Sequence, residues 1–228
     1  MIAPSNGSRH VPLHLHDVRI LLPDRELIPV MNLTVAPGEC VTVKGPSGCG
    51  TSTLRAFIAG TLDPVFTASG RVALGDADIT DVAPERRRVG IQFQDDLLFP
   101  HLSVGENLAF ALTERIRDRH ARRQQIEEAL AEADLAGFSE RDPATLSGGQ
   151  RARVALLRTL LAEPMVLLLD EPFNRLDVQL RQDFRRFVFA HAAQRGLPTL
   201  LVTHDAADAQ AAGGQVIGLA RPGDASGG

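Results

Sequence analysis

The residues best suited to chemistry form a glycine-rich loop, which reads Gly45, Pro46, Ser47, Gly48, Cys49, Gly50, Thr51, Ser52 and Thr53. This stretch matches the phosphate-binding pattern G-x-x-x-x-G-K-[ST] except that Thr51 stands in place of the lysine. Glycines let backbone N–H groups turn toward a polyphosphate, and a following helix points its positive end at the same anion. Ser52 keeps the hydroxyl that reaches Mg²⁺ in such loops. The loop therefore predicts a nucleoside triphosphate site without its point charge.

Two adjacent carboxylates follow an apolar stretch, Met165 to Leu169, that reads as a buried parallel strand. Because side chains alternate along a strand, Asp170 and Glu171 are not expected to do the same job. Asp170 is placed to hold Mg²⁺ through its water shell, and Glu171 to polarise an attacking water. The alternative is a strand end whose acids simply face solvent, and the phosphate loop upstream weighs against it.

A second anion-binding pattern is formed by Ser147, Gly148, Gly149 and Gln150, which follow Leu146. Ser147 is predicted to cap the next helix, and the two glycines leave N–H groups of its first turn bare for an anion. Ser147 and Gln150 have the spacing of a capping box, as do Ser103 and Glu106.

The elements that must position these motifs alternate between strands and helices. We expect strands at Leu13–Leu22, Leu33–Val35, Cys40–Val43, Arg71–Leu74, Val89–Phe93, Met165–Leu169, Leu200–Val202 and Val216–Leu219. We expect helices from Thr51 to Gly60, throughout 103–161, and from Asp177 to Arg195. The arginines of Glu85–Arg88 and Arg115–Arg123 are interpreted as solvated faces, and His10, His14 and His16 as surface histidines rather than a metal cluster.

Taken together, these motifs resemble the nucleotide-binding subunit of an ABC transporter over about Leu13 to Leu219. The likeness is greatest to importer subunits of the thiamine, iron and sulfate type, and Asp142–Thr145 is similar to the same stretch of a thiamine-type ATPase. The resemblance implies an α/β fold: a P-loop (RecA-like) core with an N-terminal antiparallel β-subdomain and an inserted α-helical signature subdomain. We expect one domain over 1–228, with core and β-subdomain at 1–95 and 163–220, helical subdomain at 96–162 and a flexible tail at 221–228.

The resemblance also implies roles for single residues. Gln94 joins the core to the helical insert and senses Mg²⁺ and the attacking water, and His204 contacts the γ-phosphate. Asn174–Asp177 matches the loop that crosses to a partner subunit, although Arg175 stands where many relatives have a small residue. The segment 97–104 resembles the part of importers that touches the permease. Expected catalytic residues are thus Glu171, His204 and Gln94; nucleotide-binding residues are 45–53, 147–150 and Asp177; and metal-binding residues are Ser52, Gln94 and Asp170.

The implied mechanism is a head-to-tail pair, most simply of identical subunits, with each ATP and its Mg²⁺ between one subunit's loop and the other's Ser147–Gln150. An integral membrane permease would hold the pair at the cytoplasmic face of the inner membrane, with a solute-binding protein as an indirect partner. A net charge of -4 argues against nucleic acid as a partner. No apolar run reaches the roughly 18 residues of a transmembrane helix. Two cysteines, one of them in the phosphate loop, favour a reducing compartment without a disulfide.

Two departures from the family pattern bear on activity. Thr51 supplies no cation, so we expect ATP binding to weaken about tenfold to a hundredfold and turnover to fall by a further factor of about 10² to 10³. Lys44 precedes the loop and is not expected to substitute. The chain has no Trp or Tyr to stack on adenine, which leaves Leu21–Arg25 to pack on the base.

The origin of Thr51 is open between an introduced substitution, a natural loss and a sequencing difference, since one base change converts a lysine codon to threonine. Two other functions also stay open. One is a soluble ABC ATPase of iron–sulfur cluster assembly, which would not co-purify with a permease. The other is a regulator that binds nucleotide without hydrolysing it, which ordinary ATP turnover would exclude.

Overall fold

The computed structural model describes residues 10–112 and 116–220, and in these it forms two β-sheets. The first sheet is antiparallel, in the order β2-β1-β4-β5. Its strands are β1 (Leu13–Leu22), β2 (Arg25–Val35), β4 (Thr67–Leu74) and β5 (Ala77–Asp78). The second sheet is parallel, in the order β6-β7-β8-β3-β9. Its strands are β3 (Cys40–Lys44), β6 (Val89–Gln92), β7 (Val166–Asp170), β8 (Thr199–Val202) and β9 (Val216–Gly218).

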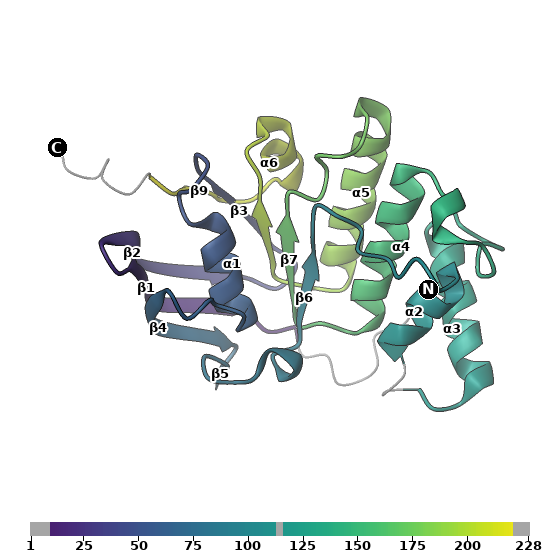
Figure 1. Cartoon of the computed structure of the whole chain (residues 1–228), viewed down its shortest axis with the longest axis horizontal. Coiled ribbons are helices and arrows are strands. Elements are labelled where there is room, and N and C mark those ends of the chain that lie inside the picture. The colour runs from purple at the N-terminus through teal and green to yellow at the C-terminus, as the bar shows by residue number, and fades with distance from the viewer. Residues whose placement is uncertain (1–9, 113–115, 221–228) are drawn as a thin grey trace.

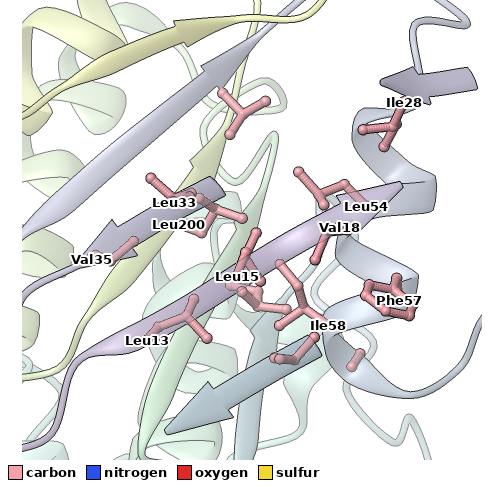
Figure 2. Close-up of a cluster of buried hydrophobic side chains, with 14 of the residues drawn as sticks. Leu13, Leu15, Val18, Ile28, Leu33, Val35, Leu54, Phe57, Ile58 and Leu200 are labelled. Atoms are coloured by element: carbon pink, nitrogen blue, oxygen red, sulfur yellow. The ribbon is translucent and has the colours of Figure 1, made fainter. Parts of the chain in front are cut away.

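Helix α1 (Thr51–Ala59) lies between the two sheets, as Figure 1 shows. Its apolar residues Leu54, Phe57 and Ile58 are buried together with strand residues of the antiparallel sheet (Figure 2). The spacing of these residues places them on one helical face, which is why α1 buries that face. The helix that begins at the phosphate loop is therefore fixed by its buried face.

The other face of the parallel sheet is covered by α4 (Gly148–Leu161) and α5 (Val178–Gln194). Alternate residues of β7 show the division: Val166 and Leu168 belong to the core around α1, whereas Leu167 and Leu169 pack with α4 and α5. Buried residues on both faces are typical of a parallel sheet. A short helix α6 (Ala206–Ala212) follows β8.

A third core joins α2 (Val104–Leu112), α3 (Arg119–Glu132) and one side of α4. The prediction of helix throughout 103–161 was wrong in part. After α3 the chain turns through Asp134 and Gly137, both at positive φ, and then forms a single 3₁₀ turn at Pro143–Thr145. Short 3₁₀ turns also include Pro84–Arg86. The α/β class with a helical insert is confirmed, while the limits set for the subdomains stay a prediction.

Arg87 corrects the expectation that the arginines of 85–88 face solvent. Only 6% of Arg87 is exposed, and its guanidinium lies at the C-terminal end of α1. Nη1 donates to the carbonyl oxygens of Phe57 at 2.9 Å and Ile58 at 3.0 Å, and Nε to that of Val82 at 2.7 Å. The last carbonyls of a helix lack the usual i+4 donors, and Arg87 donates to two of them, of which Phe57 O also accepts the Gly60 N–H at 3.1 Å.

Most remaining elements agree with the sequence patterns within a few residues, but β2 begins at Arg25 rather than at the predicted Leu33, and α6 and the short β5 were not predicted. Arg115 and the tail at 221–228 lie outside the described residues. Within the described ranges, no helix is long and apolar enough to cross a bilayer.

Candidate functional site

The predicted phosphate loop joins the end of β3 at Lys44 to the start of α1 at Thr51. Gly48 and Gly50 have φ of 81° and 99°, a conformation that favours glycine. Gly50 precedes the helix and offers no side-chain cap, so the first N–H groups of α1 have no acceptor from it. A Cβ at Gly50 would come within 3.0 Å of Leu27 and Ile28, whereas Gly48 has open space around it. This is the backbone geometry that receives an anion.

Cys49, within this loop, has a buried side chain, and a Cβ at Gly45 would meet its sulfur at 2.3 Å. Glycine is thus required at position 45 for close packing rather than for its φ. Cys40 and Cys49 are both free and buried. Burial, together with the nearby Glu39 carboxylate, raises the pKa of the Cys40 thiol to about 12.

The side chains of Asp170 and Glu171 point in different directions because β7 ends between them, and not because side chains alternate along a strand. The strand ends at Asp170, and Glu171 has a φ of 48°, so the backbone turns between them. Asp170 is directed to Arg55, with Oδ2 3.2 Å from Nε. Glu171 accepts hydrogen bonds from the Nδ2 amide of Asn174 at 3.0 Å and from the backbone N–H of His204 at 3.1 Å.

Glu171 and His204, for which the sequence analysis expects separate roles at the same nucleotide, lie next to each other. Nδ1 of His204 lies 2.7 Å from Oε1 of Glu171. The His204 side chain is 70% exposed and that of Glu171 20%, so the pair is reached from solvent on the histidine side. Since His204 follows β8 and Glu171 follows β7, adjacent parallel strands deliver both side chains to the same sheet edge.

Asp170 is half-buried at that same edge. Burial raises the pKa of its carboxyl group above the usual range, and the neighbouring Glu171 raises it further, while Arg55 opposes both effects. Gln94 is exposed in the turn after β6, directly after Phe93. The ring of Phe93 lies under the Arg55 guanidinium, 4.9 Å from its centroid, which links the Gln94 segment to Asp170.

The predicted metal ligands are oxygen donors of the kind that Mg²⁺ prefers: the exposed hydroxyl of Ser52, the Asp170 carboxylate and the Gln94 amide. No group of three or more His, Cys, Asp or Glu side chains that could hold a metal occurs in the described part of the chain. That is compatible with Mg²⁺ held largely by phosphate oxygens and water. The donor set therefore fits the ion, although one Asp170 oxygen already faces Arg55.

The second anion-binding pattern forms a complete capping box at the start of α4. The Gln150 N–H donates to Ser147 Oγ at 3.3 Å, and the Ser147 N–H donates to Gln150 Oε1 at 3.0 Å. Gly149 packs against Leu180, where a Cβ would lie 3.2 Å from a methyl carbon. Because α1 and α4 cover opposite faces of the parallel sheet, the two anion-binding helix starts lie on opposite faces too.

The structure gives Asp177 a local role in addition to the predicted one, because its carboxylate accepts the N–H of Leu180 at 3.0 Å and caps α5. Arg175, in the same loop, forms an ion pair with Asp95. Sequence reasoning noted Arg175 but did not predict this pair, since the two residues are 80 positions apart in the sequence.

Two further residues were missed. Arg55 interrupts the apolar stretch Leu54–Ile58, and this interruption was the signal that could have found it. Asn107 is fully buried in α2, where its amide donates to the carbonyl oxygens of Phe99, Leu102 and Ser103 and accepts the Phe99 N–H. A single buried amide thus holds the 99–103 segment against α2.

The chain is similar to known ATP-binding proteins over most of its length. It is 47% identical over 199 residues to the uncharacterized ABC transporter ATP-binding protein YnjD of Escherichia coli K12, covering 87% of this chain and 91% of that protein. It is 41% identical over 190 residues to the Fe(3+) ions import ATP-binding protein FbpC 1 of Rhizobium meliloti, covering 83% of this chain. Here it spans only 53% of the relative's length.

The same likeness appears among solved structures. The dimeric structure of MJ0796, a bacterial ABC transporter cassette, superposes with a TM-score of 0.75 at 29% identity and covers 91% of this chain and 94% of that one. A second MJ0796 structure, in a post-hydrolysis state bound to ADP and Pi, has a TM-score of 0.74. The profile of the ABC transporter family matches residues 29–174. This chain therefore belongs to the ABC transporter family and is an ABC-type ATP-binding domain.

Proposed function

We propose that this chain is the ATP-binding subunit of an ABC importer and that its hydrolysis is impaired by Thr51. The observation that carries the proposal is the meeting, at one edge of the parallel sheet, of the Glu171–His204 pair, Asp170 and the start of α1. The glycine conformations at 48 and 50 support nucleotide phosphates as the ligand. Relatives named as import proteins favour an importer over a cluster-assembly ATPase.

Each side chain has a distinct part in the proposed reaction. Loop N–H groups and the start of α1 bind the phosphates, and Glu171 orients and polarises the attacking water. Glu171 is held in place by Asn174 and by the His204 backbone, so the carboxylate is positioned before the nucleotide arrives. The His204 ring, exposed beside it, is assigned to the γ-phosphate. Gln94 is assigned to the same water from the segment after β6.

Mg²⁺, when bound with ATP, neutralises charge on the terminal phosphates, and we assign Ser52, Gln94 and Asp170 to it. Their oxygen donors support this assignment, as do the place of Ser52 in the first turn of α1 and the contact of Asp170 with Arg55 of the same helix.

A second subunit completes the proposed site. The phosphate loop and Ser147–Gln150 are separate helix starts, packed on either side of the parallel sheet, so one chain can offer Ser147–Gln150 to the loop of a second copy in a head-to-tail pair. The dimeric state of the MJ0796 cassette supports this arrangement. We propose a homodimer bound to an integral membrane permease at the cytoplasmic face of the inner membrane. A solute-binding protein is an indirect partner, and no nucleic acid is involved.

We propose a small molecule as the transported solute, and thiamine is one candidate. Asp142–Thr145, the stretch similar to thiamine-type subunits, has a structural role here: Asp142 accepts the Ala144 N–H at 2.8 Å and leads into the signature helix. That role suits subunits of many solutes, since the subunit itself contacts the permease rather than the solute.

The proposal is tested by comparing this chain with Thr51→Lys, measuring both ATP binding and turnover. Restoring one preorganised cation is expected to raise turnover about a hundredfold or more, because such a donor acts mainly on the transition state. Affinity is expected to rise about tenfold or more. Thr51→Met, which is bulky but uncharged, is the matched control and should restore neither.

A Thr51→Lys variant that binds ATP but stays inactive would contradict the working-ATPase proposal and favour a nucleotide-binding regulator. Failure of both proteins to bind ATP would overturn the nucleotide site itself.

A further inference from the structure

Arg55 lies on the same face of α1 as the residue that has lost its charge. It follows Thr51 by four positions and Ser52 by three, and such residues neighbour one another along a helix. Side chains of a helix tilt toward its N-terminus, so the Arg55 guanidinium extends back in the direction of the phosphate loop. The positively charged residue thus lies one helical turn after position 51, where the loop pattern has its lysine.

The contacts of Arg55 hold this cation at the edge of the predicted metal site. Nε lies 3.2 Å from Oδ2 of Asp170, and the guanidinium carbon lies 4.9 Å from the centroid of the Phe93 ring. The side chains of Arg55 and Asp170 are only 17% and 19% exposed. This half-buried arginine is held from two sides, by Phe93 just after β6 and by Asp170 at the end of β7.

The guanidinium nevertheless has unused hydrogen-bonding capacity. Its Nε is fully buried and makes no well-oriented hydrogen bond, even to Asp170. Arginine carries five N–H donors in a planar fork that suits phosphate, so pairing with one carboxylate oxygen leaves donors for an anion. Asp170 in turn keeps its second oxygen.

We propose that Arg55 supplies the positive charge of this phosphate site and binds the terminal phosphates of a nucleoside triphosphate, most strongly when Mg²⁺ is absent. Arg55 and Mg²⁺ then neutralise overlapping charge, since both act between Asp170 and the phosphates. The inference rests on the proposed nucleotide site, and it makes Arg55 a binding residue rather than a structural partner of Asp170.

The experiment measures ATP dissociation constants by calorimetry twice for each protein, once with Mg²⁺ and once with EDTA. The proteins are the full chain, Arg55→Leu, Arg55→Lys and the exposed control Arg86→Leu. Arg55→Leu is expected to weaken binding in EDTA about tenfold or more, the loss of one charge-assisted phosphate contact. With Mg²⁺ the loss is expected to be much smaller, because the freed Asp170 becomes available to the ion. Arg55→Lys should recover most of the EDTA affinity.

A purely structural Arg55 gives a different result. Its removal would weaken ATP binding by the same factor with Mg²⁺ and with EDTA. Either that equal loss or no loss at all would overturn the inference about Arg55, and both would leave the nucleotide site intact. Thermal unfolding checks that each variant folds, and Arg55→Gln takes the place of Arg55→Leu if the latter does not. Absence of ATP binding even in Thr51→Lys would instead overturn the proposed function.

Discussion

At the residue scale, the proposed site depends on a few side chains that the fold holds in unusual surroundings. Glu171 sits at a positive φ of 48° between a strand end and a loop, and three donors from Asn174 and His204 surround its carboxylate. Strain of this kind is retained where the surroundings determine the conformation. The different positions of Asp170 and Glu171 come from this backbone turn rather than from strand alternation, and their different roles stay a prediction.

Arg87 gives a prediction about stability at the same scale. Arg87→Met removes the donors that serve the carbonyls at the end of α1 and is expected to lower the free energy of unfolding by about 2–4 kcal/mol, since buried carbonyls lose their partners. Urea unfolding measures the change. The neighbouring exposed Arg86 supplies the control, and Arg86→Met should stay within about 0.5 kcal/mol of the parent chain. Equal effects of the two substitutions would contradict a capping role for Arg87.

At the element scale, the chain has two capping boxes with different expected duties. Ser103 and Glu106 form one at the start of α2, with Glu106 N–H to Ser103 Oγ at 3.2 Å and Ser103 N–H to Glu106 Oε2 at 2.8 Å. Ser147 and Gln150 form the other at the start of α4. Both were predicted from spacing, which works because a capping box is made entirely by local residues.

These two boxes allow a matched test of the signature segment. Ser103→Ala and Ser147→Ala are each expected to cost about 1 kcal/mol of stability, the usual loss of a helix cap. Only Ser147→Ala is expected to weaken ATP-dependent pairing of subunits, because only that helix start is assigned to nucleotide. Unfolding curves and sedimentation with ATP measure the two effects. Equal pairing in both variants would remove Ser147 from the nucleotide site.

At the scale of the whole molecule, ion pairs join segments that are far apart in sequence and carry the expected site residues. Arg175 pairs with Asp95 next to Gln94, and Arg151 of α4 lies 3.3 Å from Asp96. The loop assigned to the partner subunit, the Gln94 segment and the signature helix are thereby linked within one chain. Burial raises the pKa of Asp96 despite the nearby Arg151, which marks this link as half-buried.

Pairing of subunits gives a prediction at this scale, made in a Thr51→Lys, Glu171→Gln background that should bind ATP without consuming it. We expect this protein to be a dimer with ATP and a monomer without it, measured by light scattering. Adding Gly148→Asp should abolish the dimer, since its carboxylate repels the phosphates. The fold should tolerate this change: the nearest atom to a Cβ at 148 is 3.8 Å away, and an acid suits a helix start. An ATP-dependent dimer that survives Gly148→Asp would contradict the head-to-tail arrangement.

Most elements of this chain were predictable because their causes are local. The period of apolar residues marks α1 and β7, Gly60 ends α1 with a φ of 79°, and Asp177 caps α5. The helical insert was less predictable after α3, where Asp134 turns the chain at a φ of 59°, a conformation that aspartate tolerates but does not require. Helix α6 was missed because its alanine-rich sequence carries almost no amphipathic pattern.

The sequence by itself determined the family, the phosphate loop with its missing lysine, and the identity of the candidate catalytic residues. These are properties of residue type and spacing, which a motif records directly. Only the tertiary structure decided that Arg87 is buried, that Glu171 meets His204, and that Arg55 reaches Asp170. The physical reason is that burial and pairing depend on which strands become neighbours. Strand order places β7 between β6 and β8, and no local pattern in the chain encodes that order.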